Sequence, residues 1–87
     1  MKIVSVTDVK TEGLEALLGE KVLLFCTNYF YAGTLIGVNE TCVKLEGAGI
    51  VYETGKFTDS SYKDFQLLPS KVWYVSIGTI ESFGLGK

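Results

Sequence analysis

The sequence predicts an all-β domain with a short N-terminal helix, in which five antiparallel strands form a strongly bent small barrel. Residues 21–53 contain three consecutive strand-like segments separated by two short turns. Residues 22–26 are apolar on both faces, so neither face of the first segment is freely solvated. Gly33 and Gly37 lie inside the second segment, and interior glycines are typical of the bends that let a sheet curl.

Composition limits the size of the core. The chain has 87 residues, of which 47% are hydrophobic, and contains no second domain or repeat. A domain this small buries only about 60% of the surface that its unfolded chain exposes. The surplus apolar side chains must therefore lie on the outside, where contiguous patches usually mark interfaces with partners. We expect an oligomer.

The charge argues against tight binding to duplex nucleic acid. The formal net charge is −2, and the chain contains neither arginine nor histidine. A basic face is the usual footprint of nucleic-acid binding proteins, and arginine is the preferred residue for bidentate contacts to phosphates and bases. A local patch formed by some of the lysines remains compatible with the sequence.

The first segment, residues 1–20, is expected to be an arm followed by a helix. Residues 1–10 alternate weakly and favour a short strand or an extended arm. Thr11 is a candidate N-cap for a two-turn helix over Glu12–Leu18. Gly19 is suited to end this helix, because glycine readily adopts the left-handed conformation found after helix C-termini.

The central segment, residues 21–53, is expected to be a three-strand meander. The strands are predicted at Lys21–Thr27, Tyr29–Val38 and Cys42–Glu53. Turns are expected at Thr27–Asn28 and Asn39–Thr41, where asparagine tolerates the backbone of a tight turn. A kink is expected where Gly47–Gly49 interrupts the third strand.

Residues 54–70 form the single long connection, in which Asp59 or Ser60 is placed to cap one helical turn through Phe65. Connections this long are usually functional or variable. The segment 71–83 carries the last two strands, Val72–Ile77 and Ile80–Phe83. Residues 84–87 are expected to be a frayed tail.

Catalytic, metal and cofactor sites are not predicted. Cys26 and Cys42 lack a histidine partner and a CxxC spacing, so they form neither a plausible metal set nor an activated nucleophile. Buried apolar cysteines are the favoured interpretation. The carboxylates Glu40, Glu46 and Glu53 show no pairing typical of acid–base catalysis. We expect that the protein is not an enzyme.

Membrane association is not predicted either. The first ten residues lack the apolar stretch of a signal peptide and are interrupted by Asp8. The longest apolar run, residues 22–26, is far shorter than the about 20 residues that a membrane-spanning helix needs. The sequence favours a cytoplasmic protein.

Two motifs in this order of elements carry a family resemblance. The first consists of apolar, glycine and asparagine positions at Leu18, Gly19, Val22, Leu24, Cys26, Tyr31, Gly33, Leu35 and Asn39. The second is the run from Trp73 to Ile80 around the near-absent last turn. Over residues 12–83 this pattern resembles the Sm/LSm/Hfq superfamily, and it is most similar to its divergent bacterial or cyanophage-type members.

The resemblance implies a homo-oligomeric ring of about five to seven copies. In such a ring, the fourth strand of one subunit pairs with the fifth strand of the next. This pairing would cover strand edges that are otherwise exposed. The interface residues that it implies are Val72, Trp73, Tyr74, Val75, Ile80, Ser82 and Phe83.

The resemblance also implies a pocket for single-stranded RNA between two turns. The positions that carry over are Asn39, Thr41, Ser76, Ile77 and Gly78. Thr41 stands where the family has a stacking residue, and Ile77 stands where it has an arginine. Asn39 either hydrogen-bonds a base or simply suits a turn, and the turn role is favoured.

A second candidate surface combines aromatic residues with lysines. Tyr29, Phe30 and Tyr31 with Lys21 and Lys44 could bind a single strand by stacking and phosphate attraction. The alternative is that these aromatic residues belong to the core and the interface, and Tyr31 is assigned to the core.

Two functions therefore remain open: a ring that binds single-stranded RNA, for example as a chaperone or RNA-metabolism factor, which the sequence favours slightly, and a protein-interaction or structural scaffold whose RNA pocket has been lost. A small-molecule or nucleotide pocket at the subunit junction is a more distant third possibility. Lysines around a ring pore would favour RNA binding, whereas acidic residues there would favour the scaffold.

Overall fold

The structure, a computed structural model, describes residues 13–87. The predicted N-terminal arm and the first residue of the predicted helix lie outside the described residues. The elements are η1 (Leu14–Leu17), β1 (Lys21–Cys26), β2 (Phe30–Val38), β3 (Cys42–Glu53), β4 (Asp64–Leu67), β5 (Val72–Ser76), η2 (Ile77–Thr79) and β6 (Ile80–Leu85). None of the helices in this part of the chain is long and apolar enough to cross a lipid bilayer.

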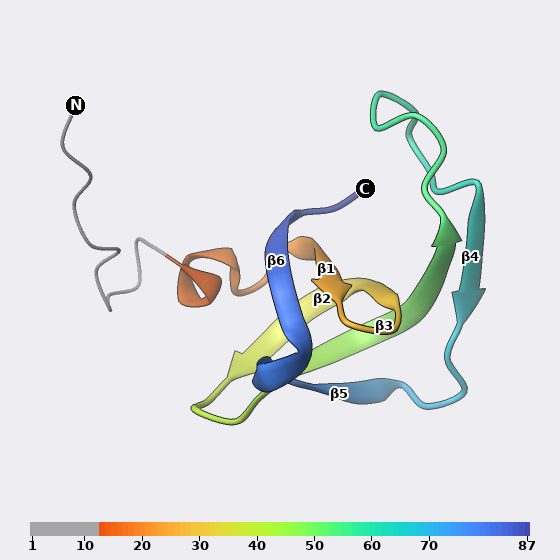
Figure 1. The fold of residues 1–87 in the computed structure, drawn as a ribbon. Coiled ribbons are helices and arrows are strands. Elements are labelled where there is room, and N and C mark those ends of the chain that lie inside the picture. Colours follow the sequence, from red (N-terminus) through yellow and green to blue (C-terminus); the bar gives the residue numbers. More distant parts are fainter. Residues whose placement is uncertain (1–12) are drawn as a thin grey trace, which may run out of the picture.

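The strands form one antiparallel sheet around β3 (Figure 1). The main strand order is β4-β3-β2-β1-β6, and β5 also pairs with β3. One edge of β3 pairs with β2. Its other edge pairs first with β5, over Cys42–Glu46, and then with β4, over Gly49–Glu53. The predicted all-β class and the three-strand meander β1–β3 are confirmed.

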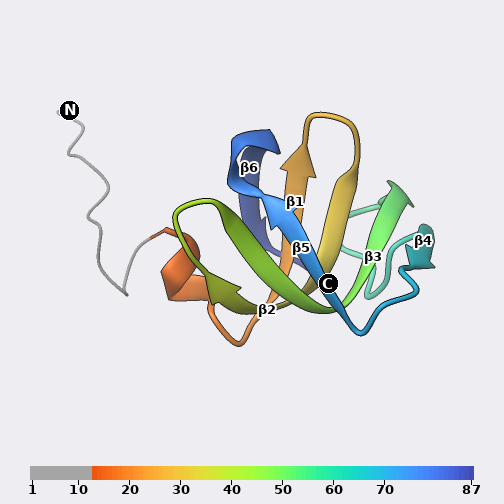
Figure 2. The ribbon, with the colours of Figure 1, turned by 90° about the horizontal axis from the view of Figure 1, so that it is seen from below.

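The sheet bends where β3 changes partners. Gly47 has a φ of 62° and lies between the residues that pair with β5 and those that pair with β4. Across from it, a Cβ on Gly33 would lie 3.0 Å from Ala48 Cα, so the two backbones approach too closely for a side chain. The ladder between β2 and β3 shifts register here and again between Leu35 and Gly37. Figure 2 shows the resulting curvature of β2 and β3.

The bent sheet buries side chains on both faces. We call the face that carries Val22, Leu24 and Leu35 the inner face; these side chains belong to the larger core cluster and are fully buried. We call the opposite face the outer face, where Leu23 and Ala32 form a smaller cluster with Val51, covered by residues of the 54–70 connection. The prediction that both faces of β1 are covered is therefore confirmed.

The sheet contains six strands, so the prediction of five was wrong. The extra strand, β4, lies in the 54–70 connection, where one helical turn ending at Phe65 was expected. Phe65 pairs with Val51 and packs on the outer-face cluster. Packing of this ring against β3 stabilises the extended conformation, and this outweighs the local preference of the sequence for a helical turn.

The N-terminal helix is shorter than predicted. The structure has a single 3-10 turn, Leu14–Leu17, preceded by Gly13 with a φ of 72°. Leu18 is already extended, with a ψ of 130°. The leucine spacing still serves packing, because Leu14 and Leu17 contact the inner-face core. Gly19 has a φ of 87°, which agrees with its predicted role as a terminator.

The C-terminal end is longer and more ordered than predicted. β5 ends at Ser76, and a 3-10 turn leads into β6, which continues to Leu85 instead of ending at Phe83. The last residues are not frayed. The backbone N–H of Gly86 donates to the carbonyl of Lys21 at 2.8 Å, and Lys87 makes several further hydrogen bonds.

A glycine-to-alanine exchange tests the contact between β3 and β4. A Cβ on Gly49 would collide with the ring of Phe65 and lie 2.6 Å from the carbonyl oxygen of Gln66. We expect Gly49→Ala to push β4 away and to lower the free energy of unfolding by about 1–3 kcal/mol, as overpacking commonly does. Urea unfolding monitors this loss.

Gly84→Ala is the matched control, because no atom lies within 4 Å of a Cβ at that position in β6. Equal stability of the two variants would contradict the packing of β4 against Gly49.

Candidate functional site

The predicted RNA-pocket residues come together at one end of the sheet. The turn between β2 and β3 lies against η2, because the backbone N–H of Ile77 donates to the carbonyl of Thr41 at 2.9 Å. Cys42 and Ser76 are paired in the ladder just before this contact. Asn39 and Thr41 thus lie on one side of a corner, and Ser76, Ile77 and Gly78 lie on the other.

Asn39 organises the β2–β3 turn. Its Oδ1 accepts hydrogen bonds from the backbone N–H of Thr41 (2.8 Å), the hydroxyl of Thr41 (3.1 Å) and the backbone N–H of Cys42 (2.8 Å). Its own backbone N–H donates to the carbonyl of Cys42. This oxygen is fully used by the turn, as the turn interpretation predicted. The side-chain NH2 of Asn39 donates to no acceptor within residues 13–87.

The corner offers few groups that could bind a nucleotide. None of its five predicted residues is aromatic or cationic, and Ile77 packs against the inner-face core. Stacking on an aromatic side chain is worth about 1–3 kcal/mol per base, and these residues cannot supply it. The hydroxyl of nearby Thr79 donates to the carbonyl of Ser76 and is thereby committed to the turn.

The residues expected at a subunit interface do not share one environment. The side chain of Val75 is buried in the inner-face core, so at an interface this residue would contribute its main chain. Trp73 is half-buried against the same core, and Ile80 also packs there. Tyr74 is 61% exposed on the opposite face of β5, where Lys44 Nζ lies 6.0 Å from the centroid of its ring.

The exposed apolar side chains of β6 include one that the sequence reasoning missed. Phe83 is 43% exposed, and Leu85, two residues further on the same face, is 65% exposed. These residues lie opposite Leu24 and Val22 in the ladder with β1, so they extend the inner face beyond its core. The alternation Phe83–Gly84–Leu85 was the available signal, but β6 was expected to end before Leu85.

The predicted aromatic–lysine surface is not assembled. Tyr29 lies 6.2 Å from Tyr31 and 6.4 Å from Tyr52 between ring centroids, in edge-to-face arrangements. Tyr31 packs against the core as expected, and burial raises the pKa of its hydroxyl. Lys44 lies beside Tyr74 instead, and Lys21 lies at the opposite end of β1 from the tyrosines, paired with Thr34.

The cysteines show no catalytic arrangement. Cys26 is buried, and burial raises the pKa of its thiol, while a hydrogen bond with Thr79 acts in the opposite direction. A raised pKa keeps this thiol protonated and poorly nucleophilic at neutral pH. Cys42 is half-buried. Within residues 13–87, no group of His, Cys, Asp and Glu side chains could hold a metal ion.

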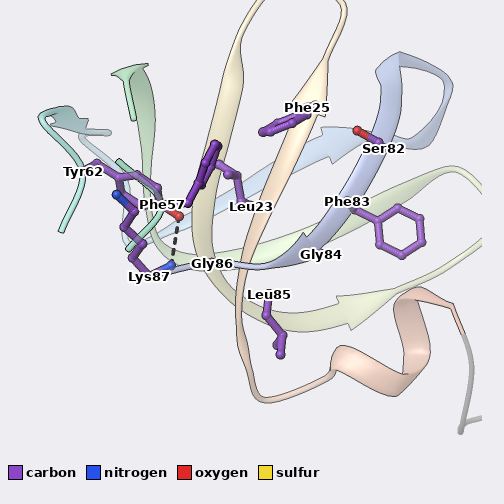
Figure 3. A pocket seen from close by; sticks show the side chains of 10 residues that line it. All are labelled: Leu23, Phe25, Phe57, Tyr62, Ser82, Phe83, Gly84, Leu85, Gly86 and Lys87. Carbon is purple, nitrogen blue, oxygen red and sulfur yellow. Dashed lines mark hydrogen bonds between the residues drawn. The ribbon is translucent and has the colours of Figure 1, made fainter. Parts of the chain in front are cut away.

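The outer face contains two hollows beside the 54–63 loop. The first has a volume of about 330 Å³, and its walls include Leu23, Phe25, Phe57, Tyr62, Ser82 and Lys87 (Figure 3). Figure 3 shows the Phe83 and Leu85 side chains pointing away from it, on the other side of β6. The second, of about 610 Å³, is lined by polar and small residues, among them Lys21, Thr34, Glu46 and Ser61. Tyr62 and Lys87 border both hollows.

Comparison with known proteins adds no further identification: the chain matches no protein-family model, no curated protein and no solved structure.

The role of Asn39 in the turn can be tested by comparing two substitutions. Asn39→Ala removes the acceptor of three hydrogen bonds, so we expect it to lower the free energy of unfolding by about 1–2 kcal/mol. Asn39→Asp keeps an acceptor oxygen at that place and should be destabilised less. Urea unfolding of both variants measures the difference. If Asn39→Ala is as stable as the unaltered protein, the turn does not depend on this side chain.

Proposed function

We propose that this protein is a ring-forming subunit of the Sm-like type, and that its ring is a scaffold for protein partners. The observation that carries the proposal is a set of strand edges that the described residues leave open: β4, β5 and β6 each pair with one strand only, and the proposed assembly uses the edges of β5 and β6. β5 pairs only with β3, and β6 pairs only with β1. Open edges of this kind are templates for pairing with another chain.

The course of the chain supports assembly through these two edges. β5 and β6 are joined by the three-residue turn η2, yet each pairs with a different strand of the sheet. If β5 of one copy paired with β6 of the next, each subunit would use two different surfaces. Such a head-to-tail interface closes into a ring when the rotation between copies permits it.

The side chains at the edge of β6 also support assembly. Phe83 and Leu85 expose apolar surface next to the inner-face core, and adjacent exposed apolar residues are a common sign of an interface. A neighbouring β5 along β6 would cover both side chains. The six-stranded bent sheet, with β6 returning to β1, is compatible with the small barrel that the family resemblance implies.

The scaffold role is favoured over RNA binding by the corner at Asn39. The oxygen of Asn39 is committed to its turn, and none of the five predicted pocket residues is aromatic or cationic. The net charge of −2 also gives a ring of these subunits little electrostatic attraction for a polyanion.

Assembly is tested by placing charges on β6. We expect the unaltered protein to have a mass of about five to seven times its subunit mass of 9.5 kDa by light scattering or native mass spectrometry. Phe83→Glu combined with Leu85→Glu should yield folded monomers. The fold should survive because both side chains are already partly exposed, and assembly should be lost because burying carboxylates in an apolar interface is unfavourable.

Leu67→Glu is the matched control, since Leu67 is 70% exposed on β4, which the proposed interface does not use. This variant should retain the full mass. A monomeric unaltered protein at micromolar concentration would exclude the ring.

Single-stranded RNA binding is the second candidate, and two observations favour it. The fold brings the five predicted pocket residues together, and the NH2 group of Asn39 can donate to a base or ribose. Tyr29 and Tyr52, which lie edge-to-face, add exposed rings on which bases can stack.

RNA binding is tested by fluorescence anisotropy with labelled oligo-U and oligo-A at low and at physiological salt. If the corner binds RNA, Asn39→Asp should weaken binding at least tenfold, because it replaces the donating NH2 group by a carboxylate while the turn is retained. Tyr52→Ala should weaken binding instead if the tyrosines form the site. No binding to either oligomer at low salt would leave only the scaffold.

A further inference from the structure

The side chain of Lys87 is bound in an unusually complete set of contacts. Its ammonium group donates to the backbone carbonyl oxygens of Thr54 (2.7 Å), Lys56 (2.7 Å) and Ser61 (3.1 Å). The same Nζ lies 5.0 Å from the ring centroid of Tyr62 and 5.8 Å from that of Phe57. We call these three carbonyls and two rings the ammonium cage.

The cage is built by the loop itself. Gly55 has a φ of 69°, which reverses the chain between the carbonyls of Thr54 and Lys56. The hydroxyl of Thr54 donates to the carbonyl of Gly55, and the backbone N–H of Asp59 donates to that of Lys56. Tyr62 stacks on Phe65 with 6.0 Å between ring centroids, and Phe65 is anchored on the outer-face core. The loop therefore holds its acceptors in place.

The chemistry of the cage selects a primary ammonium group. Carbonyl oxygens only accept hydrogen bonds, and a primary ammonium has three N–H donors for the three oxygens. The faces of aromatic rings attract the positive charge. A quaternary ammonium has no N–H to donate, and no nitrogen of a guanidinium carries the three N–H donors that three oxygens around one nitrogen require. Hard metal cations such as Ca²⁺ and Mg²⁺ take about six oxygen ligands, whereas the cage offers three carbonyl oxygens.

We propose that the ammonium cage is a binding site for a lysine side chain, which Lys87 fills in cis and a lysine of a partner protein fills when Lys87 leaves. This site lies on the outer face and does not depend on ring formation. It would give the proposed scaffold a recognition site for its partner.

Exchange of the two lysines is sterically reasonable. The ring of Phe57 is 67% exposed, so the cage is open to solvent on that side. Two main-chain bonds hold Lys87 near the cage: its N–H donates to the Tyr62 hydroxyl at 3.0 Å, drawn as a dashed line in Figure 3, and Gly86 N–H donates to Lys21. Lys87 borders the 330 Å³ hollow, so its departure would also enlarge that hollow.

The test empties the cage and refills it with a small probe. Lys87→Met keeps the apolar stem and removes the ammonium, so we expect Tm to fall by about 4–8 °C, the shift typical of losing one net hydrogen bond in a domain of this size. Addition of n-butylammonium, which reproduces a lysine side chain, should restore Tm and shift the ring NMR signals of Tyr62 and Phe57 in a saturable manner. The unaltered protein should respond at least tenfold more weakly.

Two controls define the specificity. Tetramethylammonium and potassium ions at the same concentration should not restore Tm of Lys87→Met. Lys71→Met, which alters an exposed lysine before β5, should leave Tm unchanged. Absence of n-butylammonium binding to folded Lys87→Met would overturn the proposal, as would equally strong binding of tetramethylammonium or potassium.

A measurement on the unaltered protein covers the case in which Lys87→Met does not fold. The ammonium protons of Lys87 should exchange with water at least tenfold more slowly in NMR than those of Lys71, because three carbonyls hold them. Equal exchange rates would show that the cage is not formed in solution and would overturn the proposal.

Discussion

The structure depends on strand β3, which pairs with two different strands along one of its edges. β3 pairs with β5 before Gly47 and with β4 after it. These two strands therefore lie along the same edge of β3, one on each side of its bend. At the bend, the backbones at Gly33 and Ala48 approach so closely that a side chain at Gly33 would have to push them apart. Because β5 is turned away from β4 at this point, it forms the open edge on which the proposed assembly rests.

The sequence was sufficient for those features that local chemistry determines. The β2–β3 turn was predictable because Asn39 hydrogen-bonds to residues two and three positions further along the chain. β4 was not predictable, because the extended state of residues 64–67 depends on Phe65 packing against a strand more than ten residues away. Over four residues, the leucine spacing fits a 3-10 turn as well as an α-helix. The ordered end of the chain depends on the distant 54–63 loop.

The candidate site shows the same division. The five pocket residues were brought together as expected, because their positions follow from the ends of three strands and from the short turn η2. Their chemistry was also predictable, since residue types alone show that aromatic and cationic groups are missing. The inward direction of Val75 and the exposure of Leu85 were not predictable from the sequence, because both depend on the register of β5 against β3 and of β6 against β1. The ammonium cage consists largely of backbone carbonyls, which leave no signature in a sequence.

The position of Trp73 has a practical consequence. It is the only tryptophan of the chain, and its indole packs half-buried against the inner-face core from β5, the strand whose second edge is open. The emission of an indole shifts to shorter wavelength when water is removed from around it. Intrinsic fluorescence of this one side chain therefore reports on two events, exposure of the core and coverage of the β5 edge, with opposite spectral shifts and without any attached dye.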